Sequence, residues 1–267
     1  MATQTQQGSS GIQGPLWDAR ADDWVRIQEP LMRRAFEAGL DALAVTPSMR
    51  LLDVGCGSGL ALRLAADRGA AVSGLDASSA LLEHARRRVP GAPLVQGELE
   101  ELPFADGSFD AVTGFNSFQY AARPAAALAE AARVLAPAGR VLYLNWAPPE
   151  QCEAAAYLAA IGGLLPPPKP GAPGPFALSD SEAIIRVFGE AGLEIGSTAD
   201  VTVVWSYPDE PTAIAGLMAA GPIVLAIDHA GLEAVADATR DFLEPFRTDD
   251  GGYRITNVFR YAIGDPR

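Results

Sequence analysis

The stretch LLDVGCGSGL, residues 51–60, places three glycines at alternate positions directly behind an apolar run that ends in Asp53. Glycine loses more conformational entropy on folding than any other residue, so this pattern is typical of places where side chains would obstruct a turn or a ligand. The apolar run predicts a strand over residues 49–55, and residues 59–69 have the pattern of a helix. A strand, a glycine turn and a helix bring backbone N–H groups close to a ligand. We therefore expect a binding loop here.

The alternation of strands and helices continues along the chain. Further strands are expected over residues 70–76, 92–97, 109–116, 139–146, 194–208 and 253–263. Helices are expected over residues 18–43 (one or two), 78–89, 125–136, 179–193 and most of 209–247. Strands that alternate with helices of this length imply an α/β fold with a parallel, doubly wound sheet. The proline-rich stretch 166–175 predicts a long surface connection.

Composition restricts the classes of partner. The chain has 267 residues, 49% of them hydrophobic, and a formal net charge of −13, which argues against nucleic acid as a partner. Its two cysteines, Cys56 and Cys152, provide neither a disulfide framework nor the spacing of a metal site, so no metal and a cytoplasmic location are expected. Residues 1–15 lack the pattern of a signal peptide, and residues 1–14 are expected to be a disordered tail. The uncharged stretch 211–227 is too short and too interrupted for a membrane helix, so no membrane partner is expected.

Two common nucleotide-binding motifs do not fit the glycine loop. The dinucleotide fingerprint requires glycine or alanine at its sixth position, where this chain has Leu60. The phosphate-binding P-loop requires lysine followed by serine or threonine, which this loop lacks.

The run from Asp53 to Gly59 resembles motif I of the class I S-adenosylmethionine-dependent methyltransferases. The resemblance extends to GLDAS, where Asp76 follows Gly55 by 21 residues (76 minus 55), to GELEELPFADGSFDAV and to RVLAPAGRVL. It covers roughly residues 49–146. It implies a Rossmann-like sheet of seven strands, mainly parallel with an antiparallel last strand, and S-adenosylmethionine as the cofactor.

The resemblance and the expected position of Asn116 at the carboxyl edge of the sheet together predict the cofactor site. Asp76 would bind the ribose hydroxyls, Glu98 would accept from the adenine amino group and Leu99 would cover a ring face. Asp53 would organise the loop or meet the ligand amine. The complete set of expected cofactor-binding residues is Asp53, Gly55, Gly57, Gly59, Asp76, Ala77, Glu98, Leu99, Asn116 and Trp24.

Catalytic residues are predicted by elimination. The chain has two histidines, and His84 lies among arginines in a helix, so His229 is the candidate base for a hydroxyl or acidic carbon acceptor. The alternative interpretation is that His229 only packs against its neighbours and has no catalytic role. Tyr120 is the weaker candidate. The arginines at 86–88 and the acids Glu100, Glu101 and Asp106 are interpreted as solvated charges.

A single domain over residues 15–267 is expected, with a helical cap formed by residues 15–45, 147–178 and 206–247. The cap has few charges, so the predicted function is methyl transfer to a small, largely apolar molecule of the secondary-metabolite type. Two alternatives keep the fold and the cofactor: a cyclase or isomerase that does not transfer methyl, and a catalytically silent cofactor-binding subunit. The oligomeric state stays open.

Overall fold

The computed structural model describes residues 8–167 and 174–267. It contains one seven-stranded sheet with the strand order β3-β2-β1-β4-β5-β7-β6. The strands are β1 Arg50–Val54, β2 Ala71–Asp76, β3 Leu94–Gln96, β4 Phe109–Phe115, β5 Leu135–Trp146, β6 Leu193–Tyr207 and β7 Tyr253–Pro266. Strands β1 to β5 pair in parallel, and β7 is antiparallel to both β5 and β6. The predicted fold class, with its antiparallel last strand, is confirmed.

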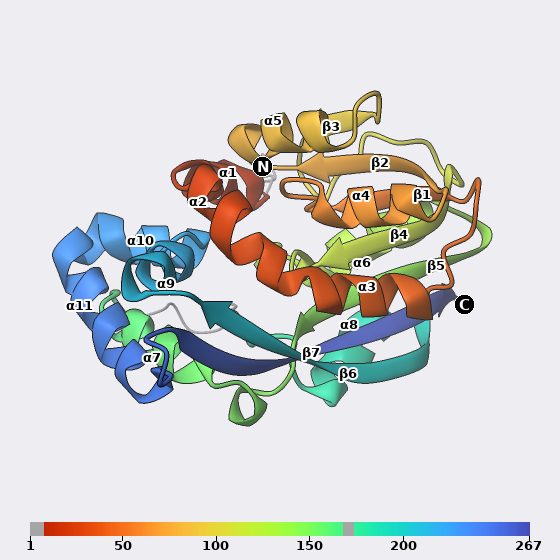
Figure 1. The fold of residues 1–267 in the computed structure, drawn as a ribbon. Helices are drawn as coiled ribbons and strands as arrows, with labels where there is room; N and C mark the ends of the chain where they lie inside the picture. The colour runs from red at the N-terminus through yellow and green to blue at the C-terminus, as the bar shows by residue number, and fades with distance from the viewer. Residues whose placement is uncertain (1–7, 168–173) are drawn as a thin grey trace, which may run out of the picture.

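Two layers of helices cover the sheet (Figure 1). The layer drawn in front contains α3 Arg33–Ala42, α4 Leu60–Asp67 and α5 Ser79–Arg88, and the layer behind contains α6 Pro124–Arg133 and α8 Ser181–Glu190. Successive residues of a strand point to opposite faces, and the core follows this rule. Leu51 packs with the first layer, whereas Leu52 packs with the second.

Four more helices gather at one end of the sheet, at the left of Figure 1. They are α7 Ala154–Gly163, α9 Glu210–Leu217, α10 Gly221–Ala230 and α11 Leu232–Leu243. Helix α11 contacts α7, α9 and α10, and α10 also contacts α1 Ser10–Asp18. In the part of the chain that the structure describes, no single helix is long and apolar enough to cross a membrane, and α9 with α10 qualifies only as a pair across a 95° bend.

The N-terminal region differs from its prediction. Residues 10–14 belong to α1 and are not a disordered tail, while residues 1–7 lie outside the described residues. In place of one or two helices, the chain forms α1, α2 Ala21–Asp23, a π-helical turn Trp24–Gln28, a 3₁₀ turn Glu29–Met32 and α3. Helix α3 covers the sheet face instead of joining the cap, because its apolar side is buried against the core. Most of the proline-rich connection, residues 168–173, also lies outside the described residues.

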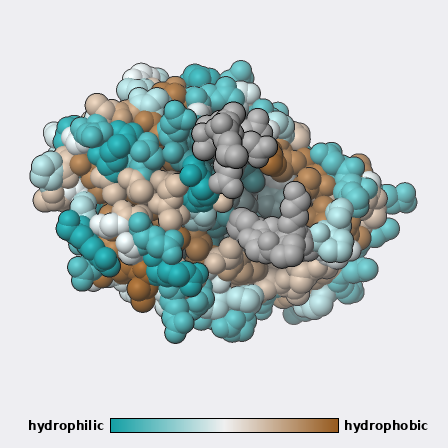
Figure 2. Space-filling view, turned by 180° about the vertical axis from the view of Figure 1, so that it is seen from behind, coloured by the Kyte–Doolittle hydropathy of each residue, from teal (hydrophilic) through white to brown (hydrophobic). Residues whose placement is uncertain are grey.

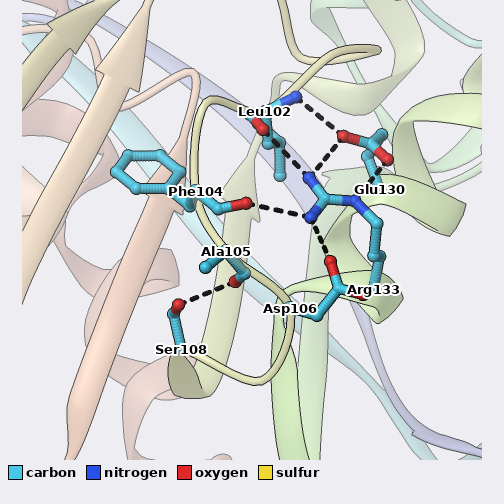
Figure 3. Close-up of polar contacts among 7 residues, drawn as sticks. All are labelled: Leu102, Phe104, Ala105, Asp106, Ser108, Glu130 and Arg133. Carbon is cyan, nitrogen blue, oxygen red and sulfur yellow. Dashed lines mark hydrogen bonds and ion pairs between the residues drawn. The ribbon is translucent and has the colours of Figure 1, made fainter.

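Arg133 at the end of α6 anchors the connection between β3 and β4 (Figure 3). Its guanidinium donates to the carbonyl oxygens of Leu102 and Phe104, both at 2.9 Å, and to Asp106 at 2.6 Å. Glu130, one helical turn earlier, accepts from the Leu102 amide at 2.8 Å and from Arg133. Asp106 is therefore tied to this anchor, although its side chain is 80% exposed.

Hydrophilic residues cover most of the face seen in Figure 2, and hydrophobic residues form small groups among them. Large apolar side chains are concentrated in the two layers of core and around one internal cavity.

Candidate functional site

The glycine loop joins β1 to α4 at the carboxyl edge of the sheet. Gly55, Gly57 and Gly59 all have positive φ, at 72°, 53° and 79°. The amides of Gly55 and Cys56 donate to the carbonyl of Leu75 at the end of β2, at 2.7 and 3.0 Å. These contacts hold the loop against the next strand.

The three glycines serve different purposes. A Cβ at Gly55 would lie 2.3 Å from the Ser117 side chain, so close packing excludes larger residues there, and one at Gly59 would lie 3.1 Å from Ala85 on α5, a tight contact. A Cβ at Gly57 would meet only Glu29, at 3.8 Å, because this position faces the cavity. Gly59 begins α4 and does not line the cavity, contrary to its predicted place in the cofactor site.

Asp76 lies where β2 ends and connects the glycine loop to α5. Its carboxylate accepts from the Gly57 amide at 2.7 Å and from the Ser78 amide at 2.8 Å. Burial raises the pKa of Asp76 to about 6, and these backbone hydrogen bonds limit the rise. Both Asp76 and Ala77 line the cavity, as their predicted role requires.

Glu98 and Leu99 follow β3 and line the same cavity. Glu98 accepts from the Ser10 amide at the start of α1, at 2.7 Å. The negative carboxylate lies at a helix N-terminus, where the helix dipole favours it. Glu98 therefore holds the N-terminal helix next to the predicted adenine position.

Asn116 follows β4, and its φ of 53° is unusual for a residue other than glycine. Its amide donates to the Leu144 carbonyl at 2.8 Å, and it lines the cavity beside Ser117. Among the described residues, neither Asn116 Oδ1 nor Ser117 Oγ has a hydrogen-bond partner, although both atoms are buried. Buried polar atoms without partners are costly, so these two indicate a position that a ligand completes.

Asp53 is almost fully buried below the loop and does not line the cavity. It accepts from Thr113 Oγ1 on β4 at 2.7 Å. Burial raises its pKa to about 8, with the Thr113 hydrogen bond opposing the shift and the carboxylates of Asp76 and Glu29 adding to it. Of the two predicted roles, the contacts of Asp53 favour organisation of the loop over contact with a ligand.

A buried ion pair that the sequence pattern did not reveal joins the N-terminal segment to the glycine loop. Arg88 on α5 donates to Glu29 at 2.6 Å and to the Ser58 hydroxyl and carbonyl at 2.5 and 3.1 Å. The Ser58 hydroxyl also donates to Glu29. Arg88 was expected to be a solvated charge, but its side chain is 24% exposed and that of Glu29 only 4%. The prediction that Glu100 is a solvated charge is also wrong, because its buried carboxylate is paired with Arg123 at 2.9 Å.

The far end of the cavity is walled by aromatic side chains. Trp146, Trp205 and Phe259 come from the neighbouring strands β5, β6 and β7, and the centroid of the Trp146 ring lies 5.6 Å from that of Trp205 and 4.6 Å from that of Phe259. We call this half of the cavity the acceptor chamber. The cap residues that also line it are Ala154, Tyr157, Leu158, Pro175, Leu217, Ala220, Pro222 and Ile223. The other half, lined by the loops after β1, β2, β3 and β4, is the cofactor half.

The predicted aromatic residues lie at the cavity, whereas the predicted base does not. Trp24 and Tyr120 both line it and both belong to a group with Trp17, whose ring centroid lies 4.8 Å from that of Trp24 and 6.0 Å from that of Tyr120. His229 is exposed in the last turn of α10 and does not line the cavity. It shares a helix face with the exposed Leu225, because residues four apart lie on one side of a helix. His84 is 2.9 Å from Asp22, away from the cavity.

Comparison with known proteins places this geometry in a family. Residues 52–143 match the model of a methyltransferase domain. Demethylmenaquinone methyltransferase of Beutenbergia cavernae is 38% identical over 112 residues, which are 42% of this chain and 47% of that protein. The chain thus aligns with less than half the length of the first curated relatives that it matches.

Solved structures show the same fold. The [4+2]-cyclase SpnF has a TM-score of 0.57 at 22% identity, with 88% of this chain and 81% of that chain covered. Geranyl diphosphate C-methyltransferase from Streptomyces coelicolor A3(2), solved with Mg²⁺, geranyl diphosphate and S-adenosyl-L-homocysteine, has a TM-score of 0.58 at 15% identity, with 100% of both chains covered. Residues 52–143 thus match a methyltransferase domain, and the glycine loop and the sheet order support a class I S-adenosylmethionine-dependent methyltransferase with S-adenosylmethionine as the cofactor.

Proposed function

We propose that the protein transfers the methyl group of S-adenosylmethionine to a small, largely apolar molecule bound in the acceptor chamber. The observation that carries this proposal is one continuous cavity, polar and lined by strand-end loops in the cofactor half, and aromatic in the acceptor chamber. Such cavities with a few placed polar groups are typical of small-molecule sites.

The residues of the cofactor half fit S-adenosylmethionine. The open space at Gly57 admits the methionine portion, and Asp76 offers a carboxylate to the ribose hydroxyls. Glu98 and Leu99 border the adenine position. The unpartnered Asn116 Oδ1 offers a hydrogen-bond acceptor to an amino group of the cofactor. Trp24 and Ala77 complete the wall.

The cofactor supplies a methyl group activated on a positively charged sulfur, whose leaving group is a neutral thioether that needs no acid. The chain's contribution is therefore to hold the acceptor in line with that methyl group and to exclude water. Positioning of this kind accounts for a large share of the rate increase in bimolecular reactions. The aromatic walls and the N-terminal helix α1, held by Glu98, border the space in which the acceptor would be held.

Calorimetry with S-adenosylmethionine, S-adenosylhomocysteine and NAD tests the cofactor assignment. We expect micromolar binding of the first two and none of NAD. Incubation with S-adenosylmethionine and an acceptor should then release S-adenosylhomocysteine together with a product heavier by one methylene unit. Conversion of an acceptor without S-adenosylhomocysteine would instead support the cyclase or isomerase alternative, and binding without any turnover would support a silent subunit.

A further inference from the structure

No cationic side chain lines the described part of the acceptor chamber, although Arg20 is near enough to Tyr157 to oppose the rise in the pKa of that hydroxyl. Among the described residues that line the cavity, the charged ones are Asp76 and Glu98, both in the cofactor half, and no lysine, arginine or histidine is present. The chain as a whole carries a formal net charge of −13. An anionic acceptor such as a carboxylate or a diphosphate would be buried here without a counter-ion, which costs several kcal/mol. The chamber therefore disfavours anionic acceptors.

The described residues that line the acceptor chamber also include no histidine and no carboxylate. Two tyrosines line the cavity: burial raises the pKa of Tyr120, on the loop after β4, to about 12, and burial also raises the pKa of Tyr157, with Thr239 and Arg20 opposing the shift. The Tyr157 hydroxyl is 3.2 Å from Thr239 Oγ1. The carboxylates of Asp76 and Glu98 are already bound to backbone amides in the cofactor half. An alcohol, a phenol or an acidic carbon would need a base to become nucleophilic, and the described residues of the wall provide none.

Aromatic side chains make up much of the described lining of the chamber. The Trp146 ring adjoins the rings of Trp205 and Phe259, and Phe36 and Phe115, whose ring centroids lie 4.7 Å apart, line the same cavity. The faces of aromatic rings attract positive charge, and the attraction is stronger where water is excluded. A ring of this wall whose face meets the chamber therefore stabilises a group that becomes cationic.

We propose that the acceptor is a neutral amine carried on an apolar body. This inference rests on the proposed methyl transfer. The nitrogen lone pair forms a bond to the methyl carbon while the carbon–sulfur bond breaks and its electron pair goes to sulfur, which leaves as a neutral thioether. The positive charge passes from sulfur to nitrogen, beside the rings of the chamber.

An amine fits better than an unsaturated carbon for a reason of proton balance. Methylation of a double bond leaves a carbocation that must lose a proton to a nearby base, and no such base lines the described chamber. A methylated tertiary amine has no proton to lose. A methylated secondary amine leaves as an ammonium ion and loses its proton to water outside.

The test uses two probes of nearly the same shape: benzyltrimethylammonium and its uncharged carbon analogue, neopentylbenzene. The protein is first saturated with S-adenosylhomocysteine, which fills the cofactor half. The cationic probe then cannot bind at the position that the sulfonium group of S-adenosylmethionine would occupy. We expect the cation to bind at least about ten-fold more tightly than the hydrocarbon, on the scale of a desolvated cation–π contact. Equal binding, tighter binding of the hydrocarbon, or no binding of either probe would overturn the proposal.

Two substitutions assign the preference to the aromatic wall. Trp146→Leu and, separately, Trp205→Leu should reduce the ratio of the two affinities severalfold, while Trp146→Phe should retain most of it. The hydrocarbon reports the loss of apolar contact in each variant, so the ratio isolates the effect on charge. An unchanged ratio in both leucine variants would count against the proposal, and if one variant fails to fold the other still provides the measurement.

Methylation of matched acceptors gives a second readout. With S-adenosylmethionine, benzyldimethylamine should be methylated faster than 4-ethylphenol or phenylacetate, and the reverse order would overturn the amine assignment. If S-adenosylhomocysteine itself does not bind, the proposed function fails at that earlier step, so the two failures are distinguishable.

Discussion

The two halves of the cavity are built by different means. The cofactor half uses backbone: glycines at positive φ, amides aimed at Asp76, and the strand-end loops of β1 to β4. The acceptor chamber uses side chains from β5, β6, β7 and the cap, which are far apart in the sequence. A backbone-built site depends on a few positions that tolerate no substitution. A side-chain-built site can change its ligand by replacing individual residues, so the two halves should respond differently to mutation.

The largest effect is expected at the open glycine. Gly57→Val places a branched side chain where only Glu29 lies within 4 Å, in the space proposed for the methionine portion. We expect affinity for S-adenosylhomocysteine to fall by more than about 100-fold, a loss of roughly 3 kcal/mol. Calorimetry measures the affinity, and circular dichroism shows whether the fold is retained.

Gly91→Val is the matched control for that experiment. Gly91 also has a positive φ, of 83°, but nothing lies within 4 Å of its Cβ position, so valine adds backbone strain without filling the cavity. If both variants lost affinity equally, strain and not lost space would explain the result.

Asp76→Ala should have the second largest effect. The variant removes an acceptor for the ribose hydroxyls and frees the Gly57 and Ser78 amides that the carboxylate now holds. Loss of hydrogen bonds to a charged group predicts a reduction in S-adenosylhomocysteine affinity of about 2 to 3 kcal/mol, or roughly 30- to 150-fold. An unchanged dissociation constant would show that the ribose does not bind here.

The raised pKa of Asp76 predicts a pH dependence. The carboxylate is ionised above a pKa of about 6 and takes up a proton below it. Ribose hydroxyls donate to the ionised form, so affinity should be constant above this pH and should fall by at most about ten-fold per pH unit below it. Titration of wild type against Asp76→Asn isolates this group, and identical pH profiles would contradict the assignment.

Most of the residues that the sequence proposed for the cofactor line the cavity, because the determinants of this half are local, whereas Asp53 and Gly59 do not line it. Glycine spacing, the acid 21 residues beyond Gly55 (76 minus 55) and the segment around Glu98 all fall within two successive βαβ units, from β1 to the end of β3. The acceptor chamber could not be predicted residue by residue, since Trp146, Trp205 and Phe259 meet only after β7 inserts between β5 and β6. The pairing of Arg88 could not be predicted for the same reason. In the sequence its helix has the pattern of a solvent-exposed helix, and Glu29 lies next to Arg88 only in the folded chain.

The ion pair between Arg88 and Glu29 predicts an effect on the stability of the fold. Arg88→Leu leaves the Glu29 carboxylate, 4% exposed, without its counter-ion. Because Arg88 is partly exposed, we expect a loss of about 2 kcal/mol, less than for a fully buried pair, and a melting temperature lower by roughly 4 to 8 °C. Arg86→Leu, at an exposed position on the same helix, is the control. If Glu29→Gln in the Arg88→Leu background restores no stability, the pair does not act as a unit.

The smallest effect is expected at His229, the base predicted from the sequence. We selected His229 by elimination, because histidine has the unperturbed pKa that base catalysis needs. Elimination does not show on which side of a helix the residue lies. The structure places His229 on the exposed side of α10, beside Leu225, while Ile223 on the same helix lines the cavity. A general base contributes about 10² to 10⁴-fold to a rate, so His229→Ala separates the two cases clearly. We expect methylation of benzyldimethylamine to change less than about two-fold and the pH–rate profile to stay the same. A loss of 100-fold or more, with normal affinity for S-adenosylhomocysteine, would mean that α10 turns His229 into the chamber during turnover, and would favour an acceptor that must be deprotonated.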